Sequence, residues 1–156
     1  MILAQAAAIL KKRSFVSVAT CDKACEPHAA PKFVYKIEDD VITLIDHTIA
    51  RTVDNLRVNP KACISFMDLE NLEGYRVSGP AELIENGPEF DEILKGFEKK
   101  LLKLSADRLI EGMKSGKPSE HYELEIPTKM IAIKVRVREA VRIGRQGELF
   151  RENAAS

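Results

Sequence analysis

The feature that most constrains the fold is a succession of short β-type segments separated by polar turns. Residues 15–20, 28–37 and 41–46 are rich in β-branched and aromatic side chains, and the stretches between them are polar. Short strands at this spacing are typical of a small barrel. The pattern therefore predicts a three-strand meander over residues 15–46.

Three later segments continue the strand pattern. Residues 62–68 and 75–85 have the same β character, and alternate residues of the second segment share a face. The last segment, residues 131–137, is the most regular, because apolar and basic side chains alternate along it. Strict alternation of this kind predicts a strand with one buried face.

Two regions are predicted to be helical, the N-terminal segment and the region that follows residue 87. The first ten residues are apolar and are followed by three basic residues, which predicts a docking helix. These charges lie on the wrong side for a signal peptide, and the segment is too short to span a bilayer. A longer helix is predicted to begin at residues 87–88, and a second helical piece is predicted over residues 106–114.

Length and composition narrow the class of protein. The chain has 156 residues, of which 45% are hydrophobic and 31% are charged, and this balance predicts one globular domain over residues 1–156. Lys plus Arg and Asp plus Glu both number 24, which argues against a nucleic-acid or membrane coat protein. Three cysteines form no disulfide framework and indicate a reducing, cytoplasmic setting.

A short helix is predicted directly after the third strand. Ile49, Val53 and Leu56 form one apolar stripe at helical spacing, and an Asn-Pro pair ends the helix. Asp46 and Thr48 are the candidate N-caps, because their side-chain oxygens can accept hydrogen bonds from the first N–H groups.

Residues 46–52 form the first candidate site. A polar turn followed by a helix start offers free backbone N–H groups and the positive end of the helix dipole to an anion. Arg51 adds a permanently charged, forked donor, and Thr48 and Thr52 add hydroxyl groups. These residues can hold a phosphate; the alternative is an ordinary capped helix with a solvated arginine.

The second candidate site lies in the middle of the second strand. Pro31 removes a backbone donor from the ladder, which usually marks an edge strand or a bulge. The small residues Ala29 and Ala30 would let a flat ring approach the backbone closely. The alternative is an edge strand that Pro31 protects from aggregation.

Taken in order, these segments resemble the pyridoxamine 5′-phosphate oxidase-like family of FMN-binding split barrels. The resemblance rests on four motifs that occur in the family's order: residues 15–20 (FVSVAT), 26–31 (EPHAAP), 51–61 (RTVDNLRVNPK) and 77–82 (VSGPAE). It implies a mainly β fold with helices, a six-stranded antiparallel split barrel with a helical insert before the last strand. It also implies a homodimer with FMN in a groove between the subunits.

The resemblance assigns roles to residues in both candidate sites. It implies that Arg51 and Thr52 bind the FMN phosphate, with His47 and Thr48 beside them. Arg51 stands where lysine is common in the family, so the charge is kept. Along the isoalloxazine ring, partly through backbone atoms, the resemblance places four residues: Ala30, Pro31, Lys32 and Phe33.

Two features of the sequence depart from the family and bear on the expected activity. The chain is short for a true pyridoxamine-phosphate oxidase, and residues 142–147 do not match that enzyme's substrate-binding segment. Oxidation of a vitamin B6 phosphate is therefore not expected. The helical insert at residues 88–115 would give this protein its own wall beside the flavin.

Other chemistry-bearing residues favour structural interpretations. Cys21, Cys25 and His28 supply at most three metal ligands, so we expect a loop and no metal site. His121 has no partner in the sequence pattern and is expected at the surface. Five arginines near the C-terminus are expected on a solvated or dimer-facing surface, or on a basic rim for an anionic substrate: Arg136, Arg138, Arg142, Arg145 and Arg151.

Three functional hypotheses follow. No nucleophile–base pair or carboxylate pair is apparent, so catalytic residues are unassigned, as expected where a flavin carries the redox chemistry. The first hypothesis is an FMN-dependent oxidoreductase that exchanges electrons with a reduced nicotinamide or another small molecule. The second is a non-catalytic flavin electron carrier or redox sensor. The third is a barrel that uses deazaflavin F420 or haem instead.

Overall fold

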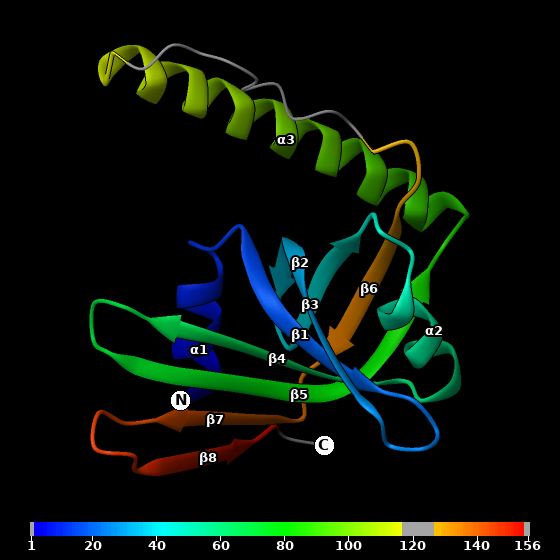
Figure 1. Ribbon diagram of the computed structural model, residues 1–156, viewed down its shortest axis with the longest axis vertical. Coiled ribbons are helices and arrows are strands. Elements are labelled where there is room, and N and C mark those ends of the chain that lie inside the picture. Colours follow the sequence, from blue (N-terminus) through cyan, green and yellow to red (C-terminus); the bar gives the residue numbers. More distant parts are fainter. Residues whose placement is uncertain (1, 117–126, 155–156) are drawn as a thin grey trace.

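A computed structural model describes residues 2–116 and 127–154, and its strands wrap into a barrel (Figure 1). The elements within these residues, in chain order, are α1 Ile2–Leu10, β1 Phe15–Cys21, β2 Pro27–Glu38, β3 Val41–Asp46, α2 Arg51–Val58, β4 Lys61–Asp68, β5 Glu73–Ile84, α3 Pro88–Lys114, β6 Ile131–Arg136, β7 Glu139–Ile143 and β8 Leu149–Asn153.

Six of the strands form a closed antiparallel barrel. The strand order is β4-β1-β2-β3-β6-β5, and pairing of β4 with β5 closes the ring. The long strand β5 makes this possible: residues 73–80 pair with β4, and residues 81–84 pair with β6. The prediction of a six-stranded antiparallel barrel in a mainly β fold with helices is confirmed.

Gly79 lies where β5 passes between its partners. A Cβ atom at this position would lie 1.9 Å from the backbone carbonyl oxygen of Arg136, a distance that no rotation of a side chain can relieve. The close approach of two backbones therefore requires glycine here.

Two apolar clusters hold the fold together. The first fills the barrel with alternate strand residues such as Val18, Ile64 and Ile133, and α1 adds Ala6 and Leu10 to it. The docking helix predicted at the N-terminus is therefore confirmed. The second cluster lies between the barrel and α3, which crosses one end of the barrel (Figure 1); its buried members are Phe33, Ile45, Ile84, Ile93, Phe97, Leu101, Met130 and Ala132.

The C-terminal strands and the long helix differ from prediction. Strands β7 and β8 form an additional hairpin beside β5, so the helical insert precedes three strands instead of one. The separate helical piece predicted at 106–114 is wrong, because α3 is one continuous helix of 27 residues. Ser105 causes no break, as serine costs little inside a helix.

The start of α2 also differs from prediction. Its N-cap is Ala50, which makes no side-chain capping hydrogen bond, so neither Asp46 nor Thr48 caps the helix. The Asp46 carboxylate instead accepts hydrogen bonds in the turn just before the helix. His121 lies outside the described residues, and within these residues no helix has the length and apolar character needed to cross a membrane.

Candidate functional site

Strand β2 has one unpaired edge along its first half. Residues 27–33 pair with β1, but pairing with β3 begins only at Phe33. Within the described part of the chain, no strand therefore covers the second edge of residues 27–32. Pro31 lies in this segment, which confirms the edge interpretation; the bulge of β2 lies further along, between Val34 and Lys36.

A buried ion pair joins the unpaired part of β2 to the end of β3. The Lys32 Nζ atom lies 2.8 Å from the Asp46 Oδ2 atom, and the two side chains are 4% and 0% exposed. Because the Phe33–Ile45 pairing fixes the antiparallel register, residues 32 and 46 face each other across the two strands. Burial of two charges at this position is tolerated because they are paired.

The Asp46 carboxylate also shapes the turn that follows β3. Its Oδ1 atom accepts hydrogen bonds from the Thr48 N–H at 2.9 Å and from the Thr48 hydroxyl at 2.7 Å, and one from the Ile49 N–H at 3.3 Å. Burial pushes the pKa of Asp46 upward, but the bonds from Lys32 and Thr48 outweigh it and hold this pKa below its ordinary value. The carboxylate is therefore ionised at neutral pH.

Ile49 has a strained backbone within this turn. Its φ angle is +45°, which is in the left-handed region that a β-branched residue rarely adopts. Such strain persists only where the surrounding contacts enforce it, and the Asp46 hydrogen bond to the Ile49 N–H is one of them. The turn is thus held in a fixed shape ahead of α2.

Arg51 and Thr52 begin α2. The Arg51 Nη2 atom lies 2.8 Å from the Glu26 Oε1 atom, and this hydrogen bond raises the pKa of Arg51 further. Both side chains are exposed, so the pair is open to solvent. The Thr52 side chain is buried, and its hydroxyl has no hydrogen-bond partner among the described residues, although such groups are nearly always satisfied.

The remaining candidates lie in or beside a groove under α3. Phe33 and the exposed His47 line this groove, which has a volume of about 710 Å³, together with residues of β1 and α3. Ala30 is half-buried and Pro31 is exposed, and both are on the unpaired part of β2. The candidates thus fall into three groups: at the start of α2, on the unpaired part of β2 and in the groove under α3. No single cavity of the described residues encloses all three groups.

These residues fit a flavin phosphate in their chemistry. The first N–H groups of α2 have no partner within the helix, and the Thr52 hydroxyl has none among the described residues. The exposed Arg51 can leave Glu26 at little cost. Sequence reasoning missed Asp46 as the centre of the turn. The available signal was an acidic residue at the end of one strand and a lysine in the neighbouring strand. Recognising that the two residues lie opposite each other requires the register between the strands, which the sequence does not show.

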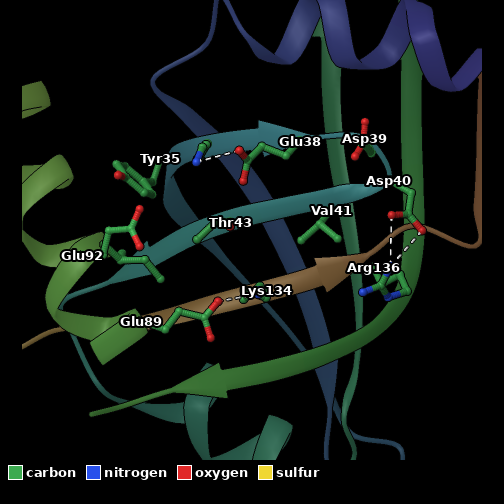
Figure 2. A pocket seen from close by; sticks show the side chains of 12 residues that line it. Tyr35, Glu38, Asp39, Asp40, Val41, Thr43, Glu89, Glu92, Lys134 and Arg136 are labelled. Atoms are coloured by element: carbon green, nitrogen blue, oxygen red, sulfur yellow. Dashed lines mark hydrogen bonds and ion pairs between the residues drawn. The ribbon is translucent and has the colours of Figure 1, made fainter. Parts of the chain in front are cut away.

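A second cavity, of about 340 Å³, lies on the outer face of the barrel beside the start of α3 (Figure 2). Its basic side chains are already paired with acids: Lys36 with Glu38, Lys134 with Glu89, and Arg136 with Asp40. Because each of these bases already has an acidic partner, the described residues of this cavity offer no free cation to an anionic ligand, and we assign none.

The other residues singled out in the sequence have structural surroundings. The described residues contain no group of three His, Cys, Asp or Glu side chains arranged to hold a metal ion, and all three cysteines are free. Four of the C-terminal arginines have acceptor partners, three in ion pairs and Arg145 at the Asn71 carbonyl. This pairing favours the surface interpretation over the basic rim.

Comparison with known families agrees with the fold and with the order of the motifs. A family model for pyridoxamine 5′-phosphate oxidase matches residues 2–136. The chain belongs to the pyridoxamine 5′-phosphate oxidase family. The match ends with β6, so the β7–β8 hairpin lies beyond it. No curated protein matches the chain.

Solved structures in and around the pyridoxamine 5′-phosphate oxidase family share this fold. A Clostridium acetobutylicum protein related to general stress protein 26 has a TM-score of 0.69 and 14% identity, over 97% of this chain and 94% of that one. An FMN-binding protein from Nostoc punctiforme has a TM-score of 0.56 and 15% identity, over 98% of this chain and 94% of that one. A heme binding protein from Mycobacterium smegmatis has a TM-score of 0.64 and 18% identity, over 98% of this chain and 58% of that one.

Proposed function

We propose that the protein binds FMN and acts as an FMN-dependent oxidoreductase on a small organic molecule. The phosphate would lie at the start of α2, held by Arg51 and Thr52 with His47 and Thr48 nearby. The isoalloxazine ring would lie along Ala30–Phe33. When bound, the ring supplies the electron transfer, and the chain supplies binding and orientation.

The observation that carries the proposal is the position of an uncovered strand edge beside a helix start. No strand in the described part of the chain pairs with one edge of residues 27–32 of β2, and a flat ring can hydrogen-bond to backbone groups on that edge. The turn at residues 46–50 follows β3, whose Asp46 lies opposite Lys32, and leads directly into α2. The Nostoc punctiforme relative, described as FMN-binding, supports the assignment.

Arg51→Ala tests the phosphate contact. Loss of one charge-assisted hydrogen bond should weaken FMN binding by roughly 10- to 150-fold and leave riboflavin binding almost unchanged, because riboflavin has no phosphate. Both affinities can be measured by quenching of flavin fluorescence. Arg57→Ala, at an exposed position in the last turn of α2, is the matched control. Equal losses for FMN and riboflavin would show that Arg51 does not contact the phosphate.

Haem is a second candidate because an imidazole lies at an aromatic groove. His47 is exposed and lines the same groove as Phe15, Phe33 and Phe97, and one relative is described as heme binding. Titration with hemin separates the two candidates. A Soret band that shifts on binding and is lost in His47→Ala would favour haem, and no shift would exclude haem at this groove.

We also propose a homodimer in a reducing, cytoplasmic setting. Arg51 and the free edge of β2 lie on an open surface of one chain, so a second copy is needed to enclose a flavin. The three free cysteines support the reducing compartment.

A further inference from the structure

The turn between β1 and β2 brings an acidic side chain to the start of α2. Glu26 is the last residue of this turn, and its Oε1 atom lies 2.8 Å from the Nη2 atom of Arg51. Strands β2 and β3 separate the two residues in the sequence, so the fold brings them together. The cation proposed to hold a phosphate is therefore paired with a carboxylate of the chain itself.

The backbone of Glu26 is held by its own turn. The Asp22 carboxylate accepts a hydrogen bond from the Glu26 N–H at 3.0 Å, and the Asp22 carbonyl accepts one from the Cys25 N–H at 3.1 Å. Pro27 follows directly, with a restricted φ angle. The Glu26 side chain is 63% exposed, so it can turn away from Arg51 without breaking these bonds.

Helix α2 is anchored to the barrel by other contacts. The Asn55 Nδ2 atom donates a buried hydrogen bond to the Thr20 hydroxyl of β1 at 3.1 Å, and Leu56 packs in the core of the barrel. Neither contact involves the Glu26–Arg51 pair. Separation of this pair would therefore leave α2 in place and free the Arg51 guanidinium.

The opposite end of α2 carries a similar pair in a different setting. Arg57, in the last turn of the helix, lies 3.2 Å from Glu85, and this pair is also exposed. The end of a helix disfavours an anion, whereas its start favours one. Of these two exposed pairs, only Glu26–Arg51 is at a position where an anion from solution would compete with the acidic partner.

A phosphate can make more contacts at this position than the Glu26 carboxylate makes. The Thr52 side chain is buried, and its hydroxyl has no partner among the described residues. The first N–H groups of α2 lie at the same end of the helix. A phosphate monoester brings three acceptor oxygens and about 1.5 to 2 negative charges at neutral pH, so it can contact these donors and Arg51 together.

We propose that Glu26 is an internal competitor at the phosphate site: it holds Arg51 when no anion is bound, and an incoming phosphate displaces it. Such competition lowers the affinity of every anion that needs Arg51 by the same factor and does not affect ligands without an anionic group. For an exposed ion pair this factor is roughly two- to fivefold. FMN as the ligand rests on the proposed function, whereas competition with inorganic phosphate does not.

Titration of the full chain with inorganic phosphate tests the competition without a flavin. The backbone amide resonances of Arg51 and Thr52, followed by NMR at neutral pH, report phosphate at the start of α2. Glu26→Gln removes the charge and keeps the shape of the side chain, and it should strengthen phosphate binding roughly two- to fivefold. The affinity for FMN should rise by the same factor, and the affinity for riboflavin should not change.

Three matched variants separate the contact from a general effect of charge. Glu85→Gln removes the carboxylate paired with Arg57 and should leave the phosphate affinity unchanged. In an Arg51→Ala background, Glu26→Gln should have no effect, because no contact remains to be released. Glu26 and, through space, Asp22 raise the pKa of Arg51, and Asp22→Asn should give a smaller gain in affinity than Glu26→Gln.

The outcomes distinguish this competition from the proposed function. Tighter phosphate binding by Glu26→Gln, in a protein that does not bind FMN, would support the competition and refute the flavin. Unchanged or weaker phosphate binding by Glu26→Gln would overturn the competition, whether or not FMN binds. An equal gain from Asp22→Asn would also overturn it, because net charge alone would then set the affinity. Amide resonances of Arg51 and Thr52 that do not respond to phosphate would overturn the phosphate site and the competition together.

Discussion

At the scale of single residues, the Lys32–Asp46 pair organises the candidate site. It lies between two barrel strands and, through Thr48 and Ile49, fixes the turn that leads into α2. The family resemblance named Lys32 as a candidate beside the flavin ring, partly through backbone atoms. It could not reveal the buried side chain, because the partner is 14 residues away and is identified only by the register between β2 and β3.

Removal of one charge of the Lys32–Asp46 pair should lower the stability of the fold. Asp46→Asn leaves the Lys32 ammonium buried without its partner and should lower the free energy of unfolding by about 3–5 kcal/mol at neutral pH. Urea denaturation measures this loss. The double variant Lys32→Met, Asp46→Leu removes both charges and should recover much of the stability. A double variant less stable than Asp46→Asn would contradict this explanation.

The same pair predicts the behaviour of the protein in acid. Since the pKa of Asp46 is lower in the fold than in the unfolded chain, its stabilising contribution is present above the unfolded pKa of about 3.9 and is lost as the pH falls through the folded pKa. The stability difference between the wild type and Asp46→Asn should therefore be constant near neutral pH and shrink below about pH 4. A difference that does not change down to pH 2 would show that the carboxylate is not held ionised.

At the scale of elements, the barrel strands were predictable and their additions were not. Segments rich in β-branched and aromatic residues between polar turns identified all six barrel strands, and alternation along the sequence of β5 and β6 supported these two. Strand β8 has exposed residues on both faces over most of its length, so no alternation marks it. The continuity of α3 was missed because its last turns extend past the barrel, where exposed Leu109, Ile110 and Met113 break the expected pattern.

One lysine adds polar contacts to the apolar packing of α3 on the barrel. The Lys100 Nζ atom donates hydrogen bonds to the carbonyl oxygens of Val34, at 2.7 Å, and Tyr35, at 2.9 Å, beside the bulge of β2, and burial lowers the pKa of this lysine. Lys100→Met removes both bonds and should destabilise the fold by about 1–3 kcal/mol. Chemical denaturation measures the loss, with Lys103→Met, an exposed position on the same helix, as the control. Equal effects of the two substitutions would refute the docking role.

At the scale of the whole molecule, the site predicted from the sequence is divided among three surfaces of one chain. The family resemblance placed Arg51, Thr52 and the β2 segment in one site. In the structure, no described strand covers the edge of β2 at residues 27–32, and Arg51 is paired with Glu26. The proposed enclosure by a second copy of the chain was expected only through the family resemblance, because no contact within one chain reveals it.

The molecular mass in solution tests this enclosure. One chain has a mass of 17.4 kDa, and light scattering on the FMN-loaded protein should give twice that value. Tight FMN binding by a protein that remains monomeric would contradict a groove shared between two copies.

The most direct test of flavin binding is titration of the purified wild-type chain with FMN, followed by quenching of flavin fluorescence. FMN binding should saturate at one FMN per chain, and riboflavin should bind more weakly because it lacks the phosphate proposed to lie at the start of α2. Fluorescence that stays unquenched at all FMN concentrations would contradict flavin binding.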